Sequence, residues 1–370
     1  MAGHYGLLGR SAPRVNVCFT LDGLSASAKN NIDLIRSGDP RTLARAISTV
    51  ENHAPGWIEL LKELFPHTGN ALTIGLTGAP GAGKSTLVDQ LAKHYRQGKS
   101  PHSTKTALSG PPNPHLSKTA KGGASDDDEY TVGIIAVDPT SPYTGGAILG
   151  DRIRMQQHFS DPGIYIRSMA TRGSLGGLAR TTADVALVLD AAGRNLIMIE
   201  TVGVGQDEVD IVRLADVTVV ILVPGMGDDV QTIKAGIMEI ADIFVINKVD
   251  QPGAERVEKE IRALQSLATR LDEWVPEIVK TVGADGQGIE ELAAAIANYK
   301  SHLETRGMLA QRRIHNWETR LVEMLRDTML QRAQAMMPEG ELARLAAEIA
   351  EHKRDPYSVV EEIANRLRTN

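Results

Sequence analysis

The stretch Gly78-Ala79-Pro80-Gly81-Ala82-Gly83-Lys84-Ser85 decides the fold of this chain. It has the spacing G-x-x-x-x-G-K-[ST], and it lies between an apolar run at 71–76, which predicts a buried strand, and a helical pattern at 85–95. Glycines let backbone N–H groups turn toward a phosphate, and the helix N-terminus adds positive charge. The sequence therefore predicts a phosphate-binding loop, in which Lys84 reaches the β- and γ-phosphates of a nucleotide and the Ser85 hydroxyl binds Mg²⁺.

Further short apolar runs follow this loop, and helical stretches separate most of them. They lie at 132–137, 163–167, 195–199, 217–223, 243–246 and 277–282. Alternating strands and helices imply right-handed crossovers and a mostly parallel sheet with helices on both faces. We therefore expect an α/β fold.

Helical patterns also flank this region. From 24 to 65 the pattern is helical, with Asp39-Pro40 as N-cap and first-turn pair, and it is helical again after Gly288. We expect an N-terminal helical extension at 1–70, a nucleotide-binding domain at 71–290 and a C-terminal helical region at 291–370. The last must bury its apolar stripes, either on the central domain or in a dimer. Residues 97–130, rich in Pro, Gly, Ser, Thr and Lys, predict a disordered insertion.

Composition excludes several classes of protein. A formal charge of −6 gives no general attraction to nucleic acid or to an anionic membrane, and 3 Trp, 7 Tyr and 4 Phe are too few for a base-stacking surface. The apolar runs are too short to span a bilayer. The single cysteine, Cys18, excludes an intrachain disulfide and favours a reducing compartment. We expect a cytoplasmic protein, with the mitochondrial matrix as the alternative because Arg10 and Arg14 precede any acid.

The motif Asn247-Lys248-Val249-Asp250, directly after the run at 243–246, points to the base of the nucleotide. The carboxylate of Asp250 can accept two hydrogen bonds from the N1–H and 2-amino group of guanine. Adenine has an acceptor at N1 and no 2-amino group, so the carboxylate would stay unsatisfied, at a cost of about 1–3 kcal/mol. The edge of a parallel sheet is where ligands bind, so the motif favours GTP over ATP.

Acidic residues follow other predicted strands. Glu200, in Glu200-Thr201-Val202-Gly203, can hold Mg²⁺ directly or through water, while Gly203 lets a loop approach the γ-phosphate. The alternative is an acid on the surface at a strand end. Asp138 and Asp151 have similar surroundings, and each could either act near the metal or cap a turn.

Taken together, these motifs resemble the MeaB/ArgK-type P-loop GTPases. The resemblance runs from about residue 33 to the end of the chain. The segments that carry it are Thr77 to Thr86, Asp138-Pro139-Thr140-Ser141, Thr144 to Asp151, Arg172-Gly173-Ser174-Leu175-Gly176-Gly177, Glu200 to Gln206, Pro224 to Asp229 and Asp355-Pro356-Tyr357.

The resemblance implies a P-loop GTPase domain and a Mg²⁺-dependent enzyme that binds GTP and GDP. It implies a chaperone that gates cofactor loading and protects an adenosylcobalamin-dependent acyl-CoA mutase of the methylmalonyl-CoA mutase type. It also implies a homodimer joined through C-terminal helices. The metal residues of the family map onto Ser85, Asp138, Asp151 and Glu200.

Three further positions follow from the same resemblance. Thr86 closes the phosphate-loop motif, and a switch segment at 225–234 carries Lys234, which we expect to act catalytically when a partner binds. The guanine-contacting loop departs from the family, because Val282-Gly283-Ala284-Asp285 replaces a Ser-Ala pair. A backbone N–H contact from Ala284 to the guanine O6 survives this change, whereas a hydroxyl contribution is lost.

Two other functions are open to the sequence. An ATPase or kinase associated with basic amino-acid transport is the main alternative, although the chain shows no kinase catalytic loop. A nickel-delivering GTPase would need His- or Cys-rich motifs, and none is present.

Overall fold

The computed structural model describes residues 26–98, 130–138, 158, 160–170, 177–201, 214–225, 240–266 and 272–369. The predicted insertion therefore lies almost entirely outside the described residues. The chain divides into two compact units, residues 1–299 and 300–370. The three domain limits expected from the sequence stay predictions.

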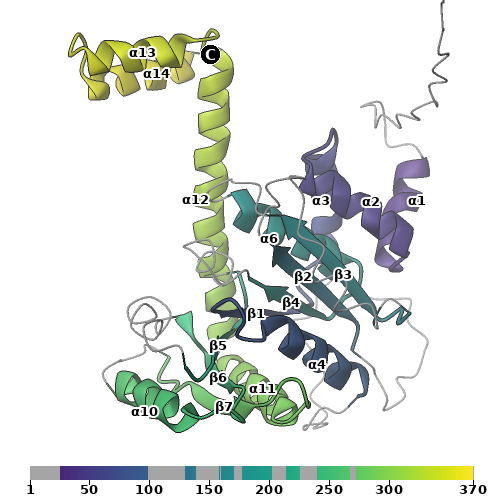
Figure 1. Cartoon of the computed structure of the whole chain (residues 1–370). Helices are drawn as coiled ribbons and strands as arrows, with labels where there is room; N and C mark the ends of the chain where they lie inside the picture. Colours follow the sequence, from purple (N-terminus) through teal and green to yellow (C-terminus); the bar gives the residue numbers. More distant parts are fainter. Residues whose placement is uncertain are drawn as a thin grey trace, which may run out of the picture. The chain divides into compact units, whose positions relative to one another are not determined.

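The first unit is built on a seven-stranded sheet in the order β3-β2-β4-β1-β5-β6-β7, in which every pair of neighbours is parallel (Figure 1). This confirms the predicted α/β fold class. Strands β4, β5 and β6 are buried along their whole length, as expected for near-continuous Val, Ile and Leu runs between two layers of helices. The strands are β1 Leu72–Gly78, β2 Val132–Asp138, β3 Ile164–Ala170, β4 Leu196–Glu200, β5 Val217–Leu222, β6 Ile243–Asn247 and β7 Glu277–Thr281.

Helices cover both faces of this sheet. The helix after the phosphate loop, α4 (Lys84–Arg96), packs against β1, β2 and β4, and α6 (Gly177–Ala191) packs against β2 and β4. The alternate side chains Ile135, Val137, Ile197 and Ile199 of β2 and β4 pack with α6 in one buried cluster, which leaves the other face of these two strands to α4. On the other half of the sheet α10 (Ala254–Gln265) packs on β6, and the chain leaves β7 through α11 (Ile289–Thr305).

The N-terminal helices join the layer formed by α6. These are α1 (Ala26–Arg36), α2 (Pro40–Glu51) and α3 (Trp57–Leu64), and α2 and α3 contact α6 (Figure 1). The Asp39 carboxylate accepts a hydrogen bond of 2.7 Å from the Thr42 N–H, which confirms the predicted N-cap. A buried cluster then joins Leu43 of α2, Val188 of α6 and Ile197 of β4 in one core.

Carboxylates order the end of the sheet away from the phosphate loop. Asp216 accepts from the Thr73 N–H at 3.0 Å, and Asp242 accepts from the Thr218 N–H at 2.8 Å. Asp190 accepts from three consecutive N–H groups, those of residues 69–71, at 2.6–3.2 Å. These carboxylates satisfy the backbone N–H groups of the turn before β1 and at the starts of β1 and β5. They thereby fix the position of β1, and with it the position of the phosphate loop that follows.

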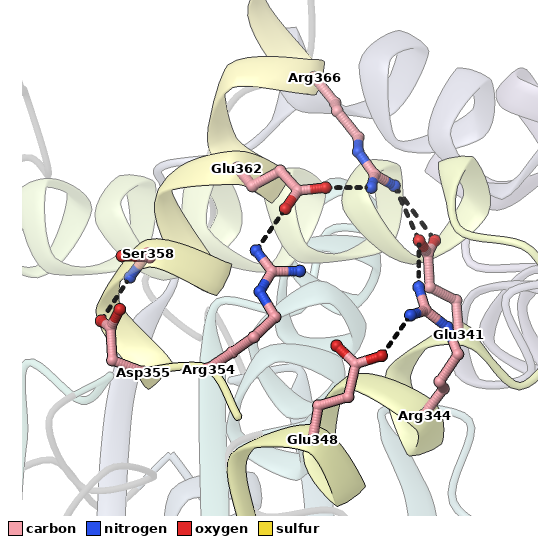
Figure 2. A network of polar contacts seen from close by, with 8 residues as sticks. All are labelled: Glu341, Arg344, Glu348, Arg354, Asp355, Ser358, Glu362 and Arg366. Carbon is pink, nitrogen blue, oxygen red and sulfur yellow. Dashed lines mark hydrogen bonds and ion pairs between the residues drawn. The ribbon is translucent and has the colours of Figure 1, made fainter. Parts of the chain in front are cut away.

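The second unit contains three helices, α12 (Met308–Met336), α13 (Glu341–Ala350) and α14 (Pro356–Thr369). Arg366 of α14 joins α13 through an ion pair with Glu341 at 3.1 Å, while Glu362 of α14 meets Arg366 at 2.5 Å and Arg354 of the connecting loop at 2.6 Å (Figure 2). Leu345 of α13 and Val359 of α14 are buried apolar side chains in this unit. Among the described residues, no helix is long and apolar enough to cross a membrane.

Candidate functional site

The predicted phosphate loop connects β1 to α4 as the sequence suggests. Two of its glycines allow the loop to pass close to neighbouring strands. Gly78 has φ +150°, and a Cβ there would collide with the Ile221 carbonyl of β5. Gly83 has φ +90°, and a Cβ there would collide with Nδ2 of Asn247. A side chain at either position would push the loop away from its neighbours, so only glycine allows this close approach.

Lys84 lies inside the loop and is only 6% exposed. Its Nζ donates to the carbonyl oxygens of Gly78 at 2.6 Å and Ala79 at 3.1 Å. The backbone N–H groups of such a loop surround a bound phosphate. An ammonium held inside the same loop is therefore within reach of the phosphate oxygens. The contacts also satisfy a charge that could not otherwise be buried.

Ser85 and Glu200 meet although 115 residues separate them in the sequence. The Ser85 hydroxyl donates to Oε1 of Glu200 at 2.5 Å, and Glu200 is 4% exposed. The contact arises because β4 lies beside β1, with Glu200 in register with Leu76. A hydroxyl and a carboxylate beside a phosphate loop are the hard oxygen ligands that Mg²⁺ prefers. The donor set therefore fits the predicted cation.

The other predicted metal ligands are less fully described. By its backbone, Asp138 ends β2, two residues after Ala136, which is in register with Glu200. Its side chain and the whole of Asp151 lie outside the described part of the chain. No group of three or more His, Cys, Asp or Glu side chains gathers among the described residues. Mg²⁺ commonly takes one or two carboxylates together with substrate phosphates, so two donors agree with such a site.

Asn247 connects the phosphate loop with the loop after β7. Its Nδ2 donates to the Ala82 carbonyl at 2.8 Å, and its Oδ1 accepts from the Thr281 hydroxyl and the Gly283 N–H, both at 3.0 Å. The side chain is deeply buried, with the residue 2% exposed. One amide thus satisfies three groups, which come from the phosphate loop, from the end of β7 and from the loop that follows β7.

The sequence motifs do not include Thr281, and they assign Gly283 no role beyond its place in the predicted guanine-contacting loop; the structure adds both as partners of Asn247. The sequence feature that could have pointed to them is Asn247, because a side-chain amide at the end of a strand needs hydrogen-bond partners from neighbouring segments. Only the pairing of β6 with β7 shows that residues 281–283 supply them.

The other predicted base-binding residues lie next to this connection, with Lys248 half-buried and Asp250 and Ala284 exposed. Lys248 has φ +59°, and its Nζ donates to the Gly81 carbonyl at 2.9 Å. Asp250 is exposed two residues later, and Ala284 is exposed in the turn closed by the Val282 and Gln287 bridge. An exposed carboxylate on a loop joined to the phosphate loop is available to a nucleotide base.

The fold and this site together define the class of the protein. A parallel sheet, a phosphate loop between β1 and α4, and an Asn-Lys-x-Asp loop joined to it by Asn247 are features of a P-loop GTPase. The chain belongs to the MeaB family: the family model described as "Methylmalonyl Co-A mutase-associated GTPase MeaB" matches residues 43–101 and 124–338. The protein is therefore a GTPase, and it binds guanine nucleotides.

Individual relatives agree with this assignment. The chain is 44% identical over 339 residues to a provisionally named GTPase of Pyrococcus abyssi, covering 91% of this chain and 95% of that protein. It is 30% identical over 332 residues to the mouse protein named methylmalonic aciduria type A homolog, mitochondrial, covering 84% and 73%. A crystal structure described as LAO/AO transport system kinase has a TM-score of 0.65 at 24% identity, covering 94% of this chain and 100% of that one. At that identity, the likeness shows a shared fold.

The structure brings most of the predicted site residues together, although their contacts with nucleotide and metal stay predictions. The P-loop residues 78–86 adjoin Glu200 and Asn247 directly, and Lys248 contacts the same loop. Gly203 and Lys234, like Asp151, lie outside the described residues.

Proposed function

We propose that this GTPase is Mg²⁺-dependent and serves as a chaperone of an adenosylcobalamin-dependent acyl-CoA mutase of the methylmalonyl-CoA mutase type. In this role it gates the loading of the mutase cofactor and protects the mutase from inactivation. The observation that carries the nucleotide part is the Asn247 side chain, which joins the base-binding loop to the phosphate loop. The mutase part is supported by the description of the family model and by the name of the mouse relative.

The phosphate loop supplies the positive groups of the reaction. The N–H groups of Gly81 to Ser85 would surround the β-phosphate, and the Lys84 ammonium would neutralise charge that develops as the bond to the γ-phosphate breaks. Because Lys84 is buried and already held by the Gly78 carbonyl, little side-chain ordering remains to be done when the nucleotide binds. These groups position the triphosphate.

Ser85 and Glu200 would hold Mg²⁺, with Asp138 and Asp151 as the further proposed ligands. When bound, Mg²⁺ neutralises the β- and γ-phosphate oxygens during hydrolysis. The hydroxyl of Ser85 and the carboxylate of Glu200 lie 2.5 Å apart, so the fold itself positions both oxygens. Such fixed oxygens favour a small cation that requires near-ideal geometry.

Asp250 would select guanine, and Ala284 would contribute its backbone N–H to the guanine O6. Lys248 keeps this loop against the phosphate loop through its bond to Gly81. The same nucleotide is thereby held at both ends by loops that Asn247 connects.

A partner would complete the catalytic site. We propose that Lys234 activates hydrolysis when the mutase binds, and that hydrolysis by the GTPase alone is slow, because a positive group supplied at the transition state is a general means of accelerating phosphoryl transfer. Binding of the mutase should therefore increase the rate of GTP hydrolysis directly.

A homodimer is also proposed, and α12 provides its support. Ile314, Leu321, Val322, Leu325 and Met329 are 42–68% exposed. With about 3.6 residues per turn, these five side chains fall on one side of the helix. An exposed apolar stripe of this kind is typical of a surface covered by a second copy of the chain.

Nucleotide preference tests the first part of the proposal. GTP and ATP binding to the whole chain should be measured by calorimetry with Mg²⁺, for wild type and for Asp250→Ala. We expect wild type to prefer GTP and the variant to lose that preference by about 5- to 150-fold, which corresponds to the cost of unsatisfied polar groups. A wild-type preference for ATP would instead favour the ATPase or kinase associated with basic amino-acid transport.

Binding to the mutase tests the second part. A methylmalonyl-CoA mutase should be mixed with the GTPase in the presence of GDP, of a non-hydrolysable GTP analogue, or of neither, and complexes should be separated by size. We expect binding that depends on the nucleotide and a faster GTP turnover in the complex. A GTPase that hydrolyses GTP normally but is indifferent to the mutase would remove the chaperone function and leave the nucleotide site intact.

A further inference from the structure

A pair of buried threonine hydroxyls lies between β1 and the end of β4. The Thr201 hydroxyl donates a hydrogen bond of 3.1 Å to the hydroxyl of Thr77. The two residues are 1% and 0% exposed, so the pair is closed off from bulk water. Thr77 directly precedes Gly78, the first residue of the phosphate-loop motif. Thr201 directly follows Glu200, which contacts Ser85, so the pair joins the neighbours of two parts of the nucleotide site.

The hydroxyl pair and the Glu200 carboxylate lie on opposite faces of the sheet. Successive side chains of a strand alternate between its two faces. Glu200 points toward α4, where it meets Ser85. Thr201 continues the row of Ile197 and Ile199, which packs in one cluster with α6. The hydroxyl pair therefore acts on the nucleotide site from the far face, through the backbone.

Thr201 is held to β1 by its backbone as well as by its side chain. Its N–H donates to the Leu76 carbonyl at 3.1 Å, which continues the pairing of β1 with β4 one residue beyond the end of β4. A single contact leaves the chain free to turn about it, whereas a second contact to the next residue of β1 opposes that rotation. The two contacts together fix the direction in which the neighbouring Glu200 side chain leaves the backbone.

Packing alone does not require hydroxyls at these two positions. Thr77 is in register with Val220 of β5, which is fully buried. Valine is similar in size to threonine and would bury apolar surface without a polar group to satisfy. Thr218 of β5 provides the contrast, because its hydroxyl is also buried but has no hydrogen-bond partner among the described residues. The bond between Thr77 and Thr201 is thus a specific contact and not a general consequence of burial.

We propose that Thr77 and Thr201 are a positioning pair for the nucleotide site, whose hydrogen bond holds the Glu200 carboxylate in the place where it binds Mg²⁺ together with Ser85. The proposal rests on the proposed Mg²⁺-dependent function. It assigns neither threonine a contact with nucleotide or metal. Because Mg²⁺ requires near-ideal geometry at short ligand distances, a small displacement of one carboxylate lowers the affinity for the ion. The hydroxyl pair therefore sets the Mg²⁺ affinity of the nucleotide complex.

The test measures how strongly Mg²⁺ tightens the binding of a non-hydrolysable GTP analogue to the full chain. Calorimetry gives the affinity with Mg²⁺ and in EDTA, and the ratio of the two is the Mg²⁺ effect. Thr201→Val and Thr77→Val each remove one hydroxyl of the pair, and a double variant removes both. Thr201→Ser keeps the hydroxyl. Thr218→Val is the matched control, because it removes an equally buried hydroxyl that has no partner in the described part of the chain. Urea unfolding measures the stability of each variant.

We expect the Mg²⁺ effect to fall about five-fold in either single valine variant, which corresponds to the loss of one hydrogen bond. The affinity in EDTA should stay within about two-fold of wild type. The double variant should match the single variants within about two-fold, because the same bond is lost in all three. Thr201→Ser and Thr218→Val should keep the wild-type Mg²⁺ effect within about two-fold. Either single valine variant is sufficient for the test if the other does not fold.

A Mg²⁺ effect of the valine variants equal to that of wild type would overturn the positioning role. So would an equal fall in Thr218→Val, because the loss of any buried hydroxyl would then have the same consequence. A double variant in which the losses of the single variants multiply would also overturn it, since the two hydroxyls would then act independently. A wild-type protein that hydrolyses GTP without Mg²⁺ would instead contradict the proposed function, so the two failures are distinguishable.

Discussion

Removing the Asn247 side chain should loosen two loops at once. In Asn247→Ala, the Ala82 carbonyl, the Thr281 hydroxyl and the Gly283 N–H lose their shared partner. Thr281 and Gly283 are buried, so water cannot replace the amide at either without rearrangement. The hydroxyl can turn to another acceptor, but the carbonyl and the N–H cannot. At about 1–3 kcal/mol for each unsatisfied buried group, we expect the free energy of unfolding to fall by about 3 kcal/mol.

Thr281→Val provides a matched control for this change. It removes one hydroxyl of similar size and leaves two of the three bonds of Asn247 in place, so we expect a loss of about 1 kcal/mol. Urea unfolding of the nucleotide-free chain, followed by circular dichroism, measures both variants. Calorimetry with GDP measures the functional consequence, which we expect to be about ten-fold weaker binding for Asn247→Ala and little change for Thr281→Val.

The reasoning would be refuted by an Asn247→Ala variant that binds GDP like wild type and unfolds at the same urea concentration. Equal losses in the two variants would also contradict it, because the predicted difference comes from the two bonds that only Asn247→Ala removes.

Three other predictions concern the cation, acid stability and assembly. Glu200→Gln keeps an acceptor for Ser85 but removes the charge, so GTP hydrolysis should require about ten-fold more Mg²⁺; a Mg²⁺ titration that matches wild type would exclude a metal role. The Arg96 guanidinium lowers the pKa of Asp161 below its usual 3.8, so the stabilisation is complete above that pH and is lost as the pH falls through the lower folded-state pKa. Arg96→Met lacks this stabilisation at neutral pH, so the difference between its unfolding free energy and that of wild type should shrink in acid, down to the part that comes from the hydrogen bond of Arg96 to the Tyr130 carbonyl; a constant difference down to about pH 2 would contradict the assignment. Leu325→Glu places a charge in the exposed stripe of α12 and should shift the protein from dimer to monomer in light scattering, whereas a wild-type monomer would exclude the proposed dimer.

Local patterns predicted much of this fold. The apolar runs locate all seven strands to within a few residues, with β3 extending to Ala170 where the run suggests an end near Arg167. Asp39-Pro40 and the turn at Gly78 to Ser85 were predictable for the same reason, since capping and loop conformation depend on neighbouring residues. The residue types of the site could also be read from short motifs.

Contacts between distant parts of the chain were not predictable in this way. Ser85 meets Glu200 because β4 lies beside β1, and His158 meets Asp89 because the chain returns to α4 before β3 begins. Asn247 likewise finds Gly83 and Gly283 only through the order of β1, β5, β6 and β7.

The sequence by itself determined the phosphate loop, the Asn-Lys-x-Asp motif and the succession of strands and helices, because backbone conformation and hydrophobic period act over a few residues. Only the tertiary structure decided which side chains share a carboxylate or an amide, because strand order and register bring together groups more than a hundred residues apart.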